Sequence, residues 1–292
     1  MGRRRGALAI VSLAVLVSVP ILPLQTQAQT GTRKIVLIVD ENAPYTKIVG
    51  DASVPYMKSL ISQGLLFTDY HAITTGSAKD YRAMSSGRTD LATPPSDNIY
   101  QALDSAGIQW TSFQESMTGT CGGGSSGNVP GTSVPLYTPG HDASHMYRAN
   151  ESCAVNDVPL ISDGQLQTLP DLSVIIPNQC DDMHTFSHQP CPSYFGSVSG
   201  TNKRQIGDAW LQHVVPLLLA DPTVTVLITF DEGGRATAQH ISMVEVGGVA
   251  AGTTDAATYD HYGLLAGLYD AFGLGVAPNN SASAVPLPIP TG

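Results

Sequence analysis

Charged side chains are scarce in this chain, and basic ones are the scarcer kind. Only 13% of the 292 residues are charged, with 14 lysines and arginines against 24 acidic residues, for a formal net charge of −10. An acidic chain is not drawn electrostatically to nucleic acid or to anionic membranes, so we expect neither as a partner. Phosphate substrates remain compatible with this charge, because a bound divalent cation inverts the local field.

Cysteine is also scarce: the chain has four, and none of them form a Cys-x-x-Cys pair. That absence argues against a zinc site built from thiolates. Four cysteines allow three disulfide pairings. We favour Cys121–Cys153, which would close a glycine-rich loop, and Cys180–Cys191, which would close a short insertion.

The first 28 residues have the pattern of a signal peptide. Three arginines precede an apolar stretch over residues 7–24, and Thr26-Gln27-Ala28 offers small residues for cleavage. The alternative is an uncleaved membrane anchor, which two prolines in the stretch disfavour. We therefore expect a secreted or cell-envelope protein with no stable membrane span after cleavage.

Apolar runs of strand length alternate with helical segments along the rest of the chain. Such alternation predicts an α/β fold with a mostly parallel central sheet and helices on both faces. We expect one domain over residues 29–275, with a long loop at 121–139, and a flexible Pro-, Ala- and Ser-rich tail over 276–292. The expected strands are 35–39, 65–67, 108–113, 172–176, 224–230 and 241–246, and the expected helices are 54–63, 78–86, a segment capped by Ser96-Asp97 that ends at Ala106, 206–220 and 260–272.

Acidic and imidazole side chains follow several of these elements. Because ligands bind beyond the carboxyl ends of parallel strands, these groups are expected to form one metal-centred site, and an enzyme is the leading hypothesis. The clusters are Asp40-Glu41-Asn42, Asp181-Asp182-Met183-His184, Asp231-Glu232 and Asp260-His261.

Each candidate also has an ordinary structural interpretation. Glu41 and Asn42 offer oxygen ligands to a hard cation but are also common turn residues. Asp231-Glu232 is the stronger signal, because adjacent carboxylates after a buried strand cost stability unless a cation pairs with them. His261 opens a helix, where a neutral, metal-binding imidazole is favoured over a charged one.

Ser77 lies where a loop enters a helix, so its hydroxyl is either a helix cap or a nucleophile in a phosphate-friendly field. Thr74 and Thr75 are rival hydroxyls. His141 and His145 follow in the long loop and are candidates to reach the same site.

Short motifs spread from Ile35 to Leu274 resemble those of the secreted phosphoesterase family, which holds bacterial acid phosphatases and phospholipases C and is related in fold to alkaline phosphatase. In size the chain resembles the mycobacterial secreted acid phosphatase most. The matching motifs are Glu41-Asn42, Pro55-Tyr56, Gly64, Ser77, Tyr81, Gly87, Leu169-Pro170, Ser173, Pro177-Asn178, Asp182-Met183-His184, Gly207-Asp208-Ala209-Trp210-Leu211, Asp231-Glu232, His261-Tyr262 and Phe272-Gly273-Leu274.

The resemblance implies a secreted, metal-dependent phosphomonoesterase that acts on a small phosphate ester, with a phospholipid or phosphoinositide as one candidate. Ser77 would attack phosphorus and form a phosphoseryl intermediate. The resemblance leaves the divalent metal undecided among Ca²⁺, Mg²⁺, Mn²⁺ and Zn²⁺. It places Glu41, Asn42, Asp231 and Glu232 around a cation, and Asp182, His184 and His261 on the opposite side, as further metal ligands or as phosphate-binding and proton-donating groups.

The sequence departs from the family pattern beside Ser77. Thr75-Gly76-Ser77 stands where the family commonly has His-Pro-Ser, and Asp80 stands where an Asn is usual. Two alternatives to the phosphomonoesterase stay open, and the changed nucleophile block supports the second of them. One is a phospholipase C or other phosphodiesterase, and the other is a catalytically weakened binding module of the same fold.

Overall fold

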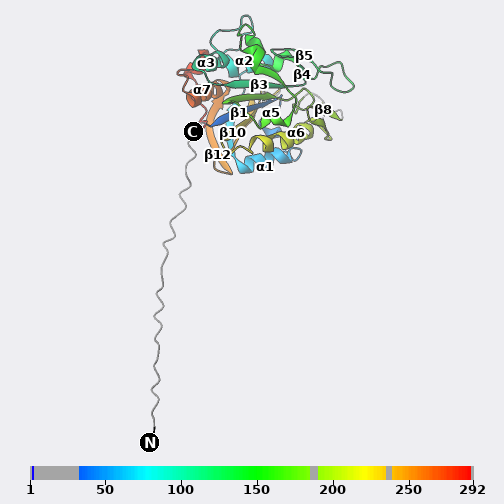
Figure 1. Cartoon of the computed structure of the whole chain (residues 1–292), viewed down its shortest axis with the longest axis vertical. Coiled ribbons are helices and arrows are strands. Elements are labelled where there is room, and N and C mark those ends of the chain that lie inside the picture. Colours follow the sequence, from blue (N-terminus) through cyan, green and yellow to red (C-terminus); the bar gives the residue numbers. More distant parts are fainter. Residues whose placement is uncertain (1, 3–32, 185–189, 235–238, 291–292) are drawn as a thin grey trace. The chain divides into compact units, whose positions relative to one another are not determined.

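The computed structural model describes residues 2, 33–184, 190–234 and 239–290. An eight-stranded sheet forms the centre of the unit that begins at residue 31 (Figure 1), in the order β12-β2-β11-β10-β1-β7-β3-β6. The strands are β1 (Lys34–Asp40), β2 (Leu65–His71), β3 (Trp110–Glu115), β6 (Asp157–Leu160), β7 (Leu172–Ile176), β10 (Val224–Phe230), β11 (His240–Val246) and β12 (Thr253–Asp260), with the short pairs β4 (Met117–Thr118) and β5 (Gly124–Ser125), and β8 (Cys191–Ser193) and β9 (Gly196–Val198).

Helices cover both faces of this sheet (Figure 1). The first and sixth helices contact each other on one face, and the second contacts the third and seventh on the other. They are α1 (Pro55–Gln63), α2 (Ser77–Ser86), α3 (Ile99–Ala106), α4 (Cys153–Asn156), α5 (Asp163–Leu166), α6 (Lys203–Leu218) and α7 (His261–Phe272), with 3-10 turns η1 (Tyr45–Lys47), η2 (Pro139–His141), η3 (Ser144–Tyr147) and η4 (Asn279–Ser283).

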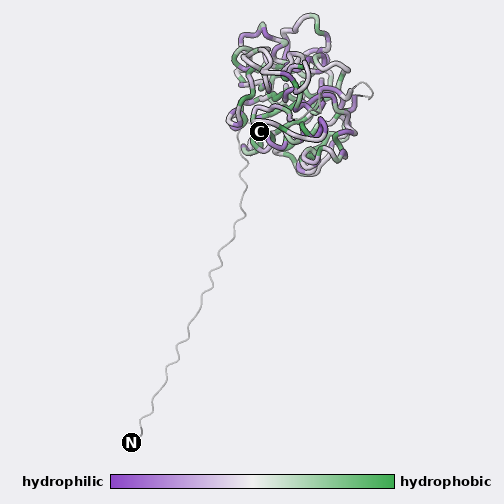
Figure 2. Tube along the Cα trace, turned by 90° about the vertical axis from the view of Figure 1, so that its right-hand side faces the viewer, coloured by the Kyte–Doolittle hydropathy of each residue, from purple (hydrophilic) through white to green (hydrophobic). Residues whose placement is uncertain are grey.

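The α/β class and the mostly parallel sheet are therefore confirmed. β1, β7 and β10 are buried along nearly their whole length, as expected of strands covered on both faces. Apolar and polar stretches alternate along the trace of this unit (Figure 2). Within the described residues, no helix is both long and apolar enough to cross a membrane.

Three strands of the central sheet differ from the expectation. β6 was not expected, because its four residues are too few to give a recognisable apolar run. β11 runs antiparallel to both β10 and β2, so the sheet is mixed. β12 was not expected at all, because its sequence is polar and mostly exposed and carries no apolar alternation. It lies at the sheet edge and pairs with β2, and backbone hydrogen bonds rather than side-chain burial form this strand.

The segment after α7 also differs from the flexible tail that composition suggested. Leu287 is 1% exposed, and its backbone N–H donates to the carbonyl of Gly263 in α7. A Cβ atom at Gly267 would lie 2.3 Å from the carbonyl oxygen of Leu287, so glycine allows the close approach. Residues 276–290 thus pack against α7, a long-range contact that composition does not reveal.

The cap of α3 also differs from the expectation. α3 begins at Ile99 and is capped by the side chain of Asn98, not by the Ser96-Asp97 pair.

Both favoured disulfides are confirmed, with Cα–Cα separations of 5.2 Å for Cys121–Cys153 and 5.6 Å for Cys180–Cys191.

Candidate active site

Three segments meet at the carboxyl end of the central strands. The parallel register sets Asp40, the last residue of β1, beside Phe230, the last of β10. The N–H of Asp231 donates to the carbonyl of Asp40 at 2.9 Å, and the N–H of Glu41 donates to the carbonyl of Asp182 at 2.9 Å. These backbone bonds bring the acidic residues after β1, β7 and β10 to one place, as expected from the sequence.

Glu41 and Asp231 form the centre of this cluster and lie within hydrogen-bonding distance of each other. Asn42 joins them, because its N–H donates to Asp231 Oδ1 at 2.8 Å and its side-chain amide donates to Glu41 Oε2 at 3.0 Å. Asn42 adopts a left-handed backbone with φ of 38°, a conformation that Asn tolerates better than most residues. Glu232 follows and is also buried.

Ser77 reaches the same cluster from α2. Its hydroxyl donates to Glu41 Oε2 at 3.2 Å. Gly76, not Ser77, is the N-cap of the helix, and no side chain caps it. The structure therefore does not use the Ser77 hydroxyl as the cap.

The rival hydroxyls have other environments. Thr74 donates its hydroxyl proton to Asp80 Oδ2 at 2.6 Å, so this hydroxyl is already engaged. Thr75 is exposed. Among the described residues, Ser77 is the one of these three whose hydroxyl forms a hydrogen bond with Glu41.

Burial and mutual repulsion raise the pKa values of these carboxyl groups. Burial is the main cause at Asp40 and Glu41, and the neighbouring carboxylates Asp182 and Asp231 add to it. Burial also raises the pKa of Asp231 to about 6, although hydrogen bonds oppose the shift. Carboxylates arranged in this way favour a positive charge among them.

A hard divalent cation fits this set of side chains. Asp40 and Asp231 are both fully buried. Among the described residues, the two side-chain oxygens of Asp40 have no hydrogen-bond partner, and neither does Oδ2 of Asp231. Buried carboxylate oxygens without partners are costly unless a cation or a proton neutralises them. Oxygen ligands of this kind are those that Ca²⁺, Mg²⁺ and Mn²⁺ prefer.

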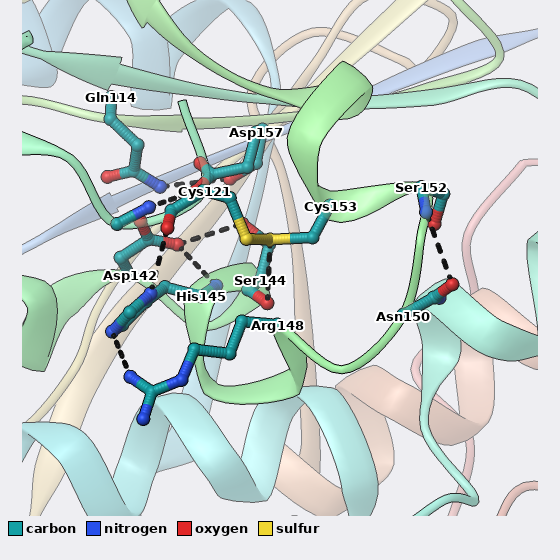
Figure 3. Close-up of a disulfide and its surroundings, with 12 residues drawn as sticks. Gln114, Cys121, Asp142, Ser144, His145, Arg148, Asn150, Ser152, Cys153 and Asp157 are labelled. Carbon is teal, nitrogen blue, oxygen red and sulfur yellow. Dashed lines mark hydrogen bonds between the residues drawn. A yellow bond between two sulfur atoms is a disulfide. The ribbon is translucent and has the colours of Figure 1, made fainter. Parts of the chain in front are cut away.

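A second cluster of ligand types consists of Cys121, Cys153 and Asp157 (Figure 3), whose candidate ligand atoms lie within 4.8 Å of one another. The two sulfur atoms are bonded to each other, so they are not thiolates that could bind a metal. His145 lies beside this disulfide, with Nδ1 3.2 Å from the carbonyl oxygen of Cys121. His145 was a candidate for the acidic cluster, and the structure places it beside the disulfide instead.

His141 does reach that cluster from the long loop. Its Nδ1 lies 3.4 Å from Glu41 Oε1, and its ring stacks on Tyr81 at a centroid distance of 5.7 Å. Tyr81 donates its hydroxyl proton to the same Glu41 oxygen at 3.1 Å. The sequence had offered His141 only as a candidate and gave Tyr81 no role, because a single loop histidine and a buried helix tyrosine are common elsewhere.

His184 lies next to Asp182, whose Oδ1 accepts the N–H of His184 at 2.9 Å. Burial, and then the charge of Lys203, lower the pKa of His184 to about 4. Burial, and then His184, lower the pKa of His141 to about 3. Both imidazoles are therefore neutral at ordinary pH.

His261 is buried with both ring nitrogens engaged. Nε2 donates to the carbonyl oxygen of Asp231 at 2.6 Å, so Nδ1 accepts the hydroxyl proton of Tyr70 at 3.0 Å. Burial lowers the pKa of His261 and keeps the ring neutral. With this arrangement His261 holds the end of β10 in place. Its role as a metal ligand or as a phosphate-binding and proton-donating group stays a prediction.

Comparison with known proteins identifies the family of this chain. The model of the phosphoesterase family matches residues 51–275. The chain belongs to the phosphoesterase family. It is 27% identical over 284 residues to a phosphatidylinositol-3-phosphatase of Mycobacterium tuberculosis, covering 92% of this chain and 87% of that protein.

Fungal relatives and solved structures extend the similarity. A phosphate-repressible acid phosphatase of Penicillium chrysogenum is 26% identical, covering 91% of this chain and 65% of that protein, so the chain spans less than two thirds of it. A solved protein of the alkaline phosphatase superfamily from Vibrio parahaemolyticus shares the fold, with a TM-score of 0.59 and 13% identity over 88% of this chain and 70% of that one. Together with the family match, the named relatives make this chain a phosphoric ester hydrolase.

Proposed function

We propose that this chain is a secreted, metal-dependent phosphomonoesterase of the acid phosphatase type, with Ser77 as its nucleophile. The observation that carries the proposal is the hydrogen bond from the Ser77 hydroxyl to Glu41 within a buried group of carboxylates. A hydroxyl at the start of a helix, oriented by an acidic ligand set, is suited to attack phosphorus and to receive the phosphoryl group.

The carboxylate and amide side chains of the cluster would hold the cation: Glu41, Asn42, Asp231 and Glu232, with Asp182 from the neighbouring segment. When bound, the cation would stabilise negative charge on the phosphoryl oxygens and lower the pKa of the Ser77 hydroxyl. Asn42 and Tyr81 orient Glu41 by donating hydrogen bonds to its two oxygens, so this side chain keeps a fixed position toward Ser77.

Two neutral imidazoles, those of His141 and His184, would bind the substrate. The side chains of His141 and His184 lie near enough for each to influence the other's environment, and His141 also contacts Glu41. Their ring N–H groups would donate hydrogen bonds to the phosphoryl oxygens. His261 positions Asp231 through the hydrogen bond to its carbonyl oxygen.

The substrate is proposed to be a small phosphate ester. The name of the mycobacterial relative makes a phosphoinositide one member of this class to test. The leader-like residues 1–28 and the two disulfides support export, because disulfides persist in oxidising compartments.

Phosphatase activity after metal removal and readdition tests the proposal. We expect the mature protein to hydrolyse p-nitrophenyl phosphate, to lose most of this activity with exhaustive chelation, and to recover it with one of the candidate cations. Metal content measured on the same samples should follow activity. Full activity in metal-free protein would contradict the metal-centred mechanism. A metal-loaded protein without activity toward p-nitrophenyl phosphate or a phosphoinositide would favour a phosphodiesterase or a binding module.

A further inference from the structure

The loop that leads into Ser77 is held by one buried carboxylate. Asp80 lies in the first turn of α2 and is fully buried. Its Oδ1 accepts the backbone N–H groups of Ile73 and Thr74, each at 2.9 Å, and its Oδ2 accepts the Thr74 hydroxyl at 2.6 Å. One side chain thus binds two successive amides and a hydroxyl of the loop before the helix.

Thr74 extends this hydrogen bonding to the residue directly before Ser77. The Thr74 hydroxyl oxygen accepts the backbone N–H of Gly76 at 3.1 Å. The result is a relay from Asp80 through Thr74 to Gly76, and it ends one peptide unit from the Ser77 backbone. We call these three residues the Asp80 relay.

The relay depends on a residue other than proline at position 76. Gly76 has φ of −151° and ψ of 107°, whereas the ring of proline fixes φ near about −65° and removes the N–H. A proline at this place would therefore change the backbone and delete the last bond of the relay. Glycine supplies the N–H but has the greatest backbone freedom of any residue, so its conformation needs an external constraint.

We propose that Asp80 is a positioning residue for catalysis: through Thr74 and Gly76 it fixes the backbone that carries Ser77, so that the Ser77 hydroxyl stays at Glu41. This inference rests on the proposed function, because it takes Ser77 as the attacking group. Reactions of this kind are sensitive to placement, and an error of about 1 Å in a reacting group costs about 100-fold in rate.

The competing interpretation is that Asp80 only stabilises the helix. An acidic residue in the first turn gains from the helix dipole wherever it occurs. That role predicts a loss of thermal stability upon Asp80→Ala with kcat nearly unchanged. The positioning role predicts a loss of kcat in protein that is still folded and still binds metal and substrate.

A double-mutant cycle in the metal-loaded enzyme separates the two interpretations. Asp80→Ala should lower kcat by about 100-fold with KM changed by less than about threefold, because the reacting hydroxyl and not substrate binding is affected. Thr74→Val should also lower kcat, and the double variant should be no slower than Asp80→Ala, since both changes break one relay. Asp80→Asn should keep most activity, because its Oδ1 still accepts both backbone N–H groups.

Thr75→Val is the matched control, since Thr75 is an exposed threonine next to the relay. It should leave kcat and KM unchanged. Asp80→Ala with full kcat and a lowered melting temperature would overturn the proposal. Additive losses in Thr74→Val and Asp80→Ala would overturn it as well, because independent effects do not describe one relay.

Amide hydrogen exchange gives a second test of the proposal, and this test does not depend on measuring enzyme activity. Exchange over residues 73–76 should be faster in Asp80→Ala than in the unmutated protein or Asp80→Asn, with exchange in α3 unchanged. Unchanged exchange at this loop would overturn the relay. An active Ser77→Ala enzyme would contradict the proposed function instead, and the exchange result would still decide whether Asp80 holds the loop.

Discussion

At the scale of one residue, the hydrogen bond of the Ser77 hydroxyl shows that Ser77 is not the cap of its helix. Gly76 occupies the N-cap position, and the hydroxyl of Ser77 donates to Glu41. From the sequence alone the roles of helix cap and nucleophile could not be separated, because both place a serine where a loop enters a helix. The decisive partner, Glu41, lies 36 residues away in the chain.

Ser77→Ala should abolish most catalysis and leave the fold intact. We expect kcat to fall by at least about 1,000-fold, because the covalent route loses its attacking oxygen. Stability should change by no more than about 1.5 kcal/mol, the usual net worth of one hydrogen bond, because Ser77 does not cap the helix. Phosphatase kinetics and thermal melts check both values. Retained kcat in Ser77→Ala would show that another group, or water, attacks the phosphorus.

Some residue roles follow from sequence and others need the folded chain. The acidic residues after β1 and β10 were expected at one site, because parallel strands end at one edge of a sheet. The engagement of both nitrogens of His261 was not expected, since Tyr70 and the carbonyl of Asp231 are brought to it only by tertiary packing. His141 was a candidate for this site, but its contact with Glu41 is likewise made only by tertiary packing.

At the scale of elements, the strength of the apolar pattern decided what could be predicted. β7 and β10 have the predicted bounds, because each is an uninterrupted apolar run buried on both faces. β12 and the C-terminal segment escaped prediction for a different reason. β12 forms because it pairs with β2 at the sheet edge. The C-terminal segment packs where it does because glycines of α7 let its backbone come close to the helix.

The C-terminal segment gives a prediction at this scale. Leu287→Ala should lower the free energy of unfolding by about 2–4 kcal/mol, because a fully buried leucine side chain is truncated against α7. Val285→Ala is the matched control, since Val285 is 61% exposed and should change stability by less than about 0.5 kcal/mol. Denaturant unfolding measures both. Equal, small effects would show that the segment does not pack as described.

At the scale of the whole molecule, a buried acid pair makes stability depend on pH. Asp142 and Asp157 lie together beside the Cys121–Cys153 disulfide (Figure 3), and both are fully buried. Burial, and then the charge of Asp142, raise the pKa of Asp157 to about 8. The groups that face the pair include the Tyr137 and Ser144 hydroxyls, which donate to Asp142, and the N–H of Gly122, which donates to Asp157.

The sign of the effect follows from proton binding. Asp157 has a pKa near 3.8 when unfolded and about 8 when folded, so between these values the folded state holds more protons. The contribution of this group to stability is therefore complete below about pH 4 and is lost as the pH rises toward 8. The molecule should be more stable in acid than at neutral pH for this reason.

Asp157→Asn tests this dependence, because an amide imitates the protonated carboxyl without titrating. The melting temperature of the unmutated, metal-saturated protein should fall more between pH 5 and about 8 than that of the variant. Metal saturation keeps the active-site carboxylates from contributing differently to the two proteins. Parallel curves for both proteins would show that Asp157 does not titrate in this range.

Trapping the phosphorylated enzyme tests the central claim most directly. Metal-loaded protein is mixed with p-nitrophenyl phosphate, quenched in acid and digested, and the peptides are sequenced by mass spectrometry. We expect one phosphoryl group on Ser77, no such group on Thr74 or Thr75, and none in chelated protein or in Ser77→Ala. Rapid turnover with no phosphoryl group on any residue, or with one on a residue other than Ser77, would contradict the assignment of the nucleophile.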